Sequence, residues 1–271
     1  KLLWEPSSGL ISGARLTQYK LWLTEHRGLT FDTYDDLWRW SVTELEAFWT
    51  SVWEFSEVRS YSPYTSVLAP SPTGNRVEGA QWFAGATLNY AEHCLRRDDD
   101  YPAVTAAHES GSMTTTTFAE LRRRVAEFAA GLREIGVGPG DAVAAYLPNV
   151  TEAVVASLAS ASIGAVWSSC PPEFGTPSVI DRFVQIGPKV LIAVDGYTYN
   201  GKRFDSLPAV AEIQAGLPSL THTVMFPYVA AQPDVSGLTN VIMWGDVPVA
   251  GAGLRFEPVP FDHPLYVVYS S

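Results

Sequence analysis

The sequence predicts an α/β protein with a mainly parallel sheet covered by helices, preceded by a tryptophan-rich helical extension. Three observations support this prediction. Beyond residue 141, short apolar runs alternate with single amphipathic stretches; residues 103–117 have the pattern of a hairpin; and six of the nine tryptophans lie within the first 53 residues. Strands joined by single helices imply right-handed crossovers, so the sheet should be parallel and covered on both faces.

The first 80 residues are expected to form the helical extension and a connector. Large apolar side chains recur at near-helical spacing from Leu37 to Trp53. We interpret them as packing residues, because aromatic residues at this spacing usually lie in a core. Residues 60–80 contain several prolines and glycines and should run over the surface as a connector. The predicted division is therefore 1–80 for the extension and connector and 81–271 for an α/β body.

A hairpin and a long helix are expected next. Residues 103–107 and 113–117 flank a Ser-Gly-Ser turn, and the second strand is rich in β-branched threonine. Thr117 and Glu120 form a capping-box pattern for a helix that ends at Gly136.

Beyond residue 141 the chain is expected to alternate between strands and helices. The expected strands are 142–147, 165–169, 190–194, 223–226 and 265–270. The expected helices are 152–162, 179–186 and 207–215. Ligands of such sheets bind at the carboxyl ends of the strands, so functional residues should lie in the loops after Leu147, Ser169 and Val194 and at the end of the last strand.

The charge balance argues against a general affinity for polyanions. The chain has 18 Lys and Arg against 29 Asp and Glu, a net charge of −11, which opposes binding to nucleic acid or to an anionic membrane. Any bound phosphate therefore needs a local site. Arg122, Arg123 and Arg124 are consecutive on the predicted helix and point around it, so we expect them to be solvated rather than gathered around one anion.

Motif order and composition exclude several classes of site. The glycines of 136–140 follow a helix and precede a strand, the reverse of the order that a dinucleotide fingerprint needs. No Gly-x-Ser-x-Gly motif occurs and the histidines lack metal-ligand spacing, so neither a hydrolase nor a metal site is predicted. Cys94 and Cys170 cannot build a disulfide framework, and the first residues contain no sustained apolar stretch. A cytoplasmic location without a signal peptide is therefore expected.

Several segments, read together, resemble the amino-terminal half of acyl-CoA synthetases in the adenylate-forming superfamily. They are Trp38–Val42, Trp82–Glu92, Thr117–Leu121 and Gly136–Asp141. Two more stretches, Ile163–Gly175 and Tyr199–Asp205, are similar specifically to the acetoacetyl-CoA synthetase branch of this family. The resemblance runs in order through essentially the whole chain, and it implies that residues 81–271 form a nucleotide-binding body that is incomplete at its carboxy-terminal end.

The resemblance implies an acid–thiol ligase. ATP and Mg²⁺ would activate acetoacetate as an acyl-adenylate with release of pyrophosphate, and CoA would then displace AMP. The implied substrates are acetoacetate, ATP and CoA, and the implied partner is a further, carboxy-terminal part of the same chain. A monomer is favoured, without nucleic acid or membrane. The family's catalytic and metal-binding groups would lie beyond residue 271, so no catalytic residue is named and the 271 residues alone are expected to be inactive.

The resemblance also indicates two phosphate sites. Residues 261–271 resemble the strand that leads into the family's phosphate-binding loop, so Ser270 and Ser271 would begin the ATP-phosphate loop, and residues 265–269 are expected to be a buried central strand. Lys202 and Arg203, expected in a loop after residues 190–194, would contact CoA as a local cation pair. Ordinary surface charge is an equally weighted alternative for the cations, and a frayed strand end is the alternative for the serines.

Other functions stay open at this point. The chain could be a non-catalytic α/β interaction or nucleotide-binding module, or a generic nucleotide-binding enzyme such as a reductase, although the missing fingerprint weakens the last. A ligase for another short-chain acid, such as acetate or propionate, is also open, because the family's acyl pocket would lie outside these residues.

Overall fold

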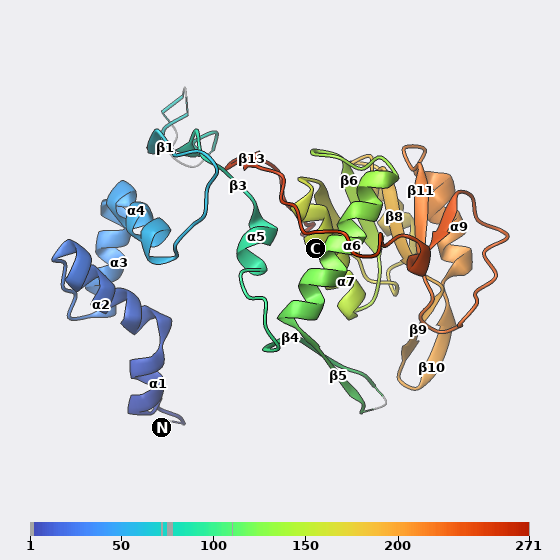
Figure 1. Ribbon diagram of the computed structural model, residues 1–271, viewed down its shortest axis with the longest axis horizontal. Coiled ribbons are helices and arrows are strands. Elements are labelled where there is room, and N and C mark those ends of the chain that lie inside the picture. Colours follow the sequence, from blue (N-terminus) through green and yellow to red (C-terminus); the bar gives the residue numbers. More distant parts are fainter. Residues whose placement is uncertain (1–2, 72, 75–77, 110, 271) are drawn as a thin grey trace. The chain divides into compact units, whose positions relative to one another are not determined.

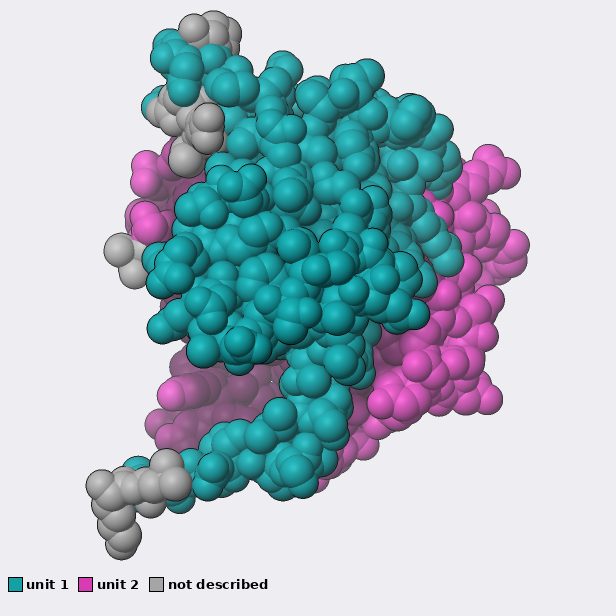
Figure 2. Space-filling model, turned by 90° about the vertical axis from the view of Figure 1, so that its left-hand side faces the viewer, with its two compact units in different colours: residues 1–87, 260–262 teal, residues 88–259, 263–271 magenta. Residues whose placement is uncertain are grey.

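The computed structural model describes residues 3–71, 73–74, 78–109 and 111–270, and the chain forms two compact units. One unit comprises residues up to 87 together with 260–262, and the other comprises 88–259 and 263–271 (Figures 1 and 2). Two short strands contain points where the chain passes from one unit to the other. They are β3 (Thr87–Leu88) and β13 (Val259–Pro260).

The first unit is helical and its small core is largely aromatic. Its helices are α1 (Ser8–Gly13), α2 (Arg15–Arg27), α3 (Tyr34–Thr43) and α4 (Leu45–Phe55). Tyr19 is buried, lies 5.1 Å from Phe55 between ring centroids, and shares a 2.6 Å hydrogen bond with Ser51. The expected packing role holds for Trp40, whose ring contacts that of Phe48, but Trp49 is 38 % exposed.

The expected connector contains regular structure. Strand β1 (Ser66–Ala69) falls within it and pairs antiparallel with β2 (Gln81–Ala84), so the prediction of a plain surface connector over 60–80 was wrong. The reason is apolar packing: Val67 and Phe83 are buried, and the Phe83 ring lies 4.4 Å from that of Trp53. The domain division at residue 80 stays a prediction.

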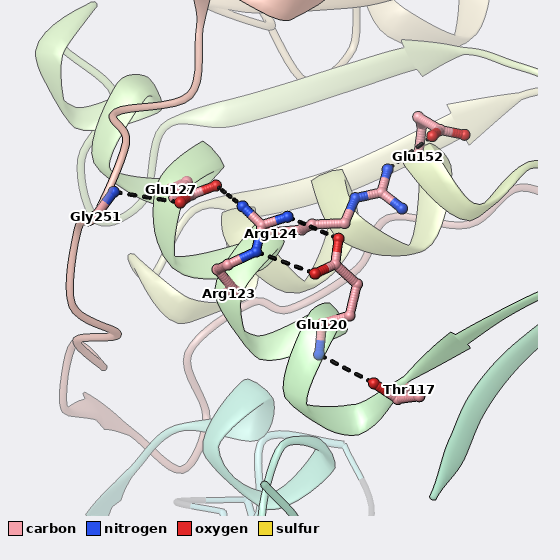
Figure 3. Close-up of polar contacts among 7 residues, drawn as sticks. All are labelled: Thr117, Glu120, Arg123, Arg124, Glu127, Glu152 and Gly251. Carbon is pink, nitrogen blue, oxygen red and sulfur yellow. Dashed lines mark hydrogen bonds and ion pairs between the residues drawn. The ribbon is translucent and has the colours of Figure 1, made fainter. Parts of the chain in front are cut away.

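The second unit begins with a short helix, the predicted hairpin and the predicted long helix. These elements are α5 (Tyr90–Cys94), β4 (Pro102–Ala107), β5 (Met113–Thr117) and α6 (Phe118–Glu134). The Thr117 side chain accepts a hydrogen bond from the Glu120 amide at 3.3 Å, which is one half of the predicted capping box. The other half is replaced, because the Glu120 carboxylate binds Arg123 instead (Figure 3).

A five-stranded parallel sheet, in the order β12-β11-β8-β6-β7, forms the centre of the second unit. Strands β11, β8 and β6 are labelled in Figure 1. Its strands are β6 (Ala142–Tyr146), β7 (Val166–Cys170), β8 (Val190–Val194), β11 (His222–Phe226) and β12 (Val241–Met243). The elements that connect them include α7 (Thr151–Ser162), α8 (Thr176–Phe183), α9 (Leu207–Gly216) and the 3-10 turn η1 (Trp244–Asp246). The predicted α/β class and parallel sheet are confirmed.

Both faces of the sheet are buried, as predicted. Val143 and Ala145 pack in the cluster that contains residues of α6 and α7, whereas Ala144 and Tyr146 pack in the cluster that contains residues of α8 and α9. This alternation along β6 follows from the two-residue period of a strand. Strand β6 therefore has no polar side chain exposed on either face, which directs attention to the strand ends.

Helix α6 closely approaches the chain after β12 at Gly131. A Cβ atom built on Gly131 would lie 1.9 Å from the main-chain oxygen of Val247, closer than any real contact. Helix propensity alone would favour alanine over glycine by about 1 kcal/mol. The close packing against Val247, and not the helix, therefore requires glycine at position 131.

We predict that Gly131→Ala lowers the free energy of unfolding by about 1–3 kcal/mol, the usual range for overpacking. Gly138→Ala is the matched control, because no atom lies within 4 Å of its built Cβ. Urea unfolding of both variants of the purified chain checks this. A Gly131→Ala variant that is as stable as the wild type would contradict the close approach.

Candidate functional site at the carboxyl edge of the sheet

The carboxyl ends of the parallel strands define one edge of the sheet, which we call the carboxyl edge. The segment after Pro264 lies beside β7 and runs toward this carboxyl edge. The Trp167 amide donates to the Leu265 oxygen at 3.0 Å, and the Val267 amide donates to the Trp167 oxygen at 2.9 Å. Residues 265–267 therefore extend the sheet beside β7, with a parallel bridge between Trp167 and Tyr266. Their carboxyl end lies at the same edge as that of β7.

The prediction that residues 265–269 form a buried central strand was wrong. Tyr266 is 41 % exposed and Val268 is 85 % exposed. The segment pairs with β7 on one side through a single bridge, and no described residue pairs with its other side. It is therefore an outermost segment of the sheet and not a central strand. Ser270 follows it and is exposed, while Ser271 lies outside the described residues.

Tyr146, at the end of β6, holds the loop that follows β7. Its hydroxyl lies 2.6 Å from the Pro172 oxygen and 3.1 Å from the Phe174 oxygen, so its one proton serves two carbonyls. The side chain is buried, and this burial raises its pKa to about 12. Sequence analysis missed this residue, although a tyrosine closing an apolar strand next to a predicted ligand loop was a usable signal.

Asp195, directly after β8, holds the loop that follows β11. It is 2 % exposed, and its carboxylate accepts the amides of Tyr228, Val229 and Ala230 at 2.6, 3.0 and 2.7 Å. The next residue, Gly196, has no room for a side chain, because its Cβ would lie 2.3 Å from the Phe204 oxygen. The buried carboxylate therefore has three donors and fixes the loop after β11.

The predicted loop that carries Lys202 and Arg203 is an antiparallel hairpin, which corrects the sequence-based expectation. It consists of β9 (Gly196–Tyr199) and β10 (Lys202–Asp205). Its Asn200-Gly201 turn has φ angles of 50° and 70°, the left-handed values that these two residues accept most readily. Both turn amides donate to the Glu109 carboxylate, at 2.7 and 3.2 Å.

The hairpin does not bring its two cations together. Lys202 and Arg203 are consecutive on β10, so their side chains point to opposite faces. Lys202 lies opposite Tyr199, on the face where the rings of Tyr197 and Phe204 stack at 4.9 Å. Both cations are exposed. The sequence-based prediction of a local cation pair is therefore wrong, because the two cations lie on opposite faces of the hairpin. The stacked aromatic rings lie on the Lys202 face.

The three consecutive arginines of α6 do not converge, as predicted. Arg123 bridges Glu120 and Glu127, and Arg124 pairs with Glu152 at 2.7 Å (Figure 3). Arg122 donates to the Leu95 oxygen and lies 3.6 Å from Asp98. The expectation of solvation was wrong for Arg122 and Arg124, whose side chains are only 26 % and 22 % exposed.

The described part of the chain does not fit a metal ion. It contains no group of three or more His, Cys, Asp or Glu side chains arranged to hold one. Cys94 and Cys170 are free thiols. Among the same residues, every helix is too short or too polar to cross a bilayer.

Comparison with known proteins shows which family the chain belongs to. Residues 91–271 match the family described as AMP-binding enzyme. The chain belongs to this family. Residues 34–94 also match the acetyl-coenzyme A synthetase N-terminus.

Several relatives that match along the whole chain are acetoacetyl-CoA synthetases. The proteins of Macaca fascicularis and Rhizobium meliloti are each 39 % identical over 100 % and 99 % of this chain. The solved acetoacetyl-CoA synthetase from Streptomyces lividans is 45 % identical, covers 100 % of this chain and superposes with a TM-score of 0.91. A malonamoyl-CoA synthetase of Penicillium aethiopicum is 34 % identical over 90 % of this chain and 35 % of its own length. The chain spans 41 % of the length of each of the three acetoacetyl-CoA synthetases.

We predict that Tyr146→Phe lowers the free energy of unfolding by about 1–2 kcal/mol near neutral pH, because two carbonyls lose their donor. The pKa of Tyr146 is raised from 10.0 to about 12. The folded wild type therefore holds this proton more tightly than the unfolded chain does. This contribution to stability is complete below pH 10 and is lost as the pH rises from about 10 through about 12.

Urea unfolding of the wild type and Tyr146→Phe at a series of pH values measures this contribution. The difference in stability between the two should shrink above pH 10. Tyr34→Phe, at a tyrosine that is 63 % exposed, is the control and should leave the pH dependence unchanged. Parallel curves for the wild type and Tyr146→Phe would contradict the assignment.

Proposed function

We propose that this chain is the amino-terminal part of an AMP-forming acetoacetate–CoA ligase. The observation that carries the proposal is the similarity to acetoacetyl-CoA synthetases along the whole chain, at 39–45 % identity and in unbroken order. ATP would activate acetoacetate as an acyl-adenylate and release pyrophosphate, and the CoA thiol would then displace AMP. The 271 residues alone would be inactive, because they span 41 % of those relatives.

Within this function, the chain would supply the platform for phosphate binding. Ser270 is exposed directly after a segment that ends at the carboxyl edge, and we propose that Ser270 and Ser271 begin the ATP-phosphate loop. Small hydroxyl residues with free amides can bind phosphate oxygens there. No catalytic residue is assigned within the chain. The described residues contain no group of three or more His, Cys, Asp or Glu side chains that could hold a metal ion, and we assign no Mg²⁺ ligand among them.

Lys202 is the residue that we propose for CoA contact. It is exposed on the hairpin face that carries the stacked Tyr197 and Phe204 rings, and Phe204 is 39 % exposed. A cation beside an aromatic surface suits a nucleotide, because the phosphate binds the cation while the base stacks on a ring. Arg203, on the opposite face, is the alternative to Lys202, and the two are separated by the comparison of variants below.

We further propose a cytoplasmic location and a monomeric ligase with small-molecule substrates. Its two free thiols and net charge of −11 suit a reducing compartment without nucleic-acid or membrane partners.

The proposed activity is tested by acetoacetate-dependent exchange of labelled pyrophosphate into ATP in the full-length protein. We expect exchange in the full-length protein and none above background in the 271-residue chain. The same assay with acetate, propionate and malonamate tests acid choice, which the malonamoyl-CoA synthetase relative makes necessary. Absence of exchange with every acid would favour a non-catalytic module, and a faster rate with another acid would replace acetoacetate.

We predict that Lys202→Glu in the full-length protein raises the KM for CoA by about tenfold to a hundredfold, the cost of a charge-assisted contact of about 1.5–3 kcal/mol. Pyrophosphate exchange should be unchanged, because it does not involve CoA. Arg203→Glu is the matched control on the other face and should change the KM for CoA by less than about threefold. A large effect of Arg203→Glu with none of Lys202→Glu would show that the wrong face was chosen.

A further inference from the structure

A cavity of about 280 Å³ lies at the carboxyl end of β7, beside the segment that leads to Ser270. Its walls are mostly apolar or aromatic. They include Trp167, Pro171, Phe174, Val267 and Tyr269. Among the described residues that line it, one carries a charge, and that residue is Arg182.

Arg182 is held in place without an acidic partner. Its guanidinium lies over two rings, 5.5 Å from the centroid of Phe174 and 5.7 Å from that of Tyr269. One guanidinium nitrogen donates to the Ser178 oxygen at 2.9 Å. The Tyr269 hydroxyl donates to the main-chain oxygen of Arg182 at 2.7 Å. The side chain and the main chain of this residue are therefore both fixed against the cavity wall.

The charge of Arg182 is not neutralised by the described part of the chain. No carboxylate there lies within 4.0 Å of its guanidinium, whereas Arg123 and Arg124 both bind glutamates. A guanidinium has five N–H donors, and the structure uses one nitrogen of this group in a protein hydrogen bond. In a protein with a net charge of −11, an oriented guanidinium at a cavity, without a carboxylate partner among the described residues, is suited to binding an anion.

We propose that Arg182 binds a phosphate ester in this cavity, with the apolar or aromatic part of the same ligand packed against Phe174 and its neighbours. The planar guanidinium matches two phosphate oxygens, and the mainly apolar walls suit a ligand that is not a bare anion. The choice of ligands rests on the proposed function, because its co-substrates ATP and CoA are both phosphate esters. The site deepens that function by adding a residue from α8.

The test is calorimetric titration of the full-length protein with ATP and, separately, with CoA. We expect Arg182→Met to weaken the binding of one of the two by about tenfold or more and to leave the other within about threefold, which identifies the source of the phosphate. Methionine keeps an apolar side chain against the two rings. Arg182→Lys, which keeps the charge, should recover part of the loss.

Two further variants separate binding from structure. Arg123→Met is the matched control, because that guanidinium is already bound by two glutamates, and it should not change either affinity. Tyr269→Phe keeps the ring and removes the hydrogen bond to Arg182, so it should weaken the same ligand by a smaller factor than Arg182→Met does. Thermal unfolding should give Arg182→Met and Arg123→Met similar midpoints.

The proposal is overturned if Arg182→Met binds both ligands as the wild type does. It is also overturned if both affinities fall together with a lowered unfolding midpoint, or if the wild type binds neither ligand. Failure of the proposed function is a different result: the wild type would bind a ligand in an Arg182-dependent way but would catalyse no pyrophosphate exchange. Exchange by the wild type with unchanged affinities in Arg182→Met would leave the function standing and remove the site.

Discussion

The burial of both faces of the parallel sheet is the constraint on which the rest of the second unit depends. Alternate residues of β6 pack into two separate cores, so every side chain of this strand is buried and apolar except for the hydroxyl of its final tyrosine. Helices on both faces leave polar groups accessible mainly where the strands end. The polar contacts of Tyr146, Asp195 and Arg182 are all found at that edge.

Buried polar groups at this edge act mainly on the main chain. Tyr146 serves two carbonyl groups, and Asp195 serves three amides. Such contacts fix loops without an ion pair, because their partners are neutral main-chain groups. The arginines of α6 are different, since each is paired within the protein, and Arg123 and Arg124 are paired with glutamates (Figure 3). The guanidinium of Arg182 is instead fixed by two rings and one carbonyl, and these partners leave its charge uncompensated.

The fold was predictable from the sequence where local periodicity decides the structure. Four strands of the sheet, β6, β7, β8 and β11, are short apolar runs, helix α6 has a clear apolar period, and their order follows from connection rules. Strand β12 was not predicted, because it has only three residues. The hairpin at 196–205 was missed because its strands are short and mostly exposed, although the Asn200-Gly201 turn was visible. Residues 265–269 are as apolar as a central strand, and apolar content alone does not say whether a neighbour exists on both sides. The hydrogen-bond partners of Tyr146, Asp195 and Arg182 could not be predicted, because they lie 26–28, 33–35 and up to 87 residues away, respectively.

The tie at Asp195 has a consequence for how this edge can change over time. Its donors are main-chain groups of residues 228–230, which every amino acid except proline supplies. These three hydrogen bonds therefore do not depend on the side chains of that loop, whereas on the other side they require a carboxylate at position 195. The main-chain conformation of this loop is thus held by a residue that lies more than thirty positions earlier in the chain, and not by the loop's own side chains.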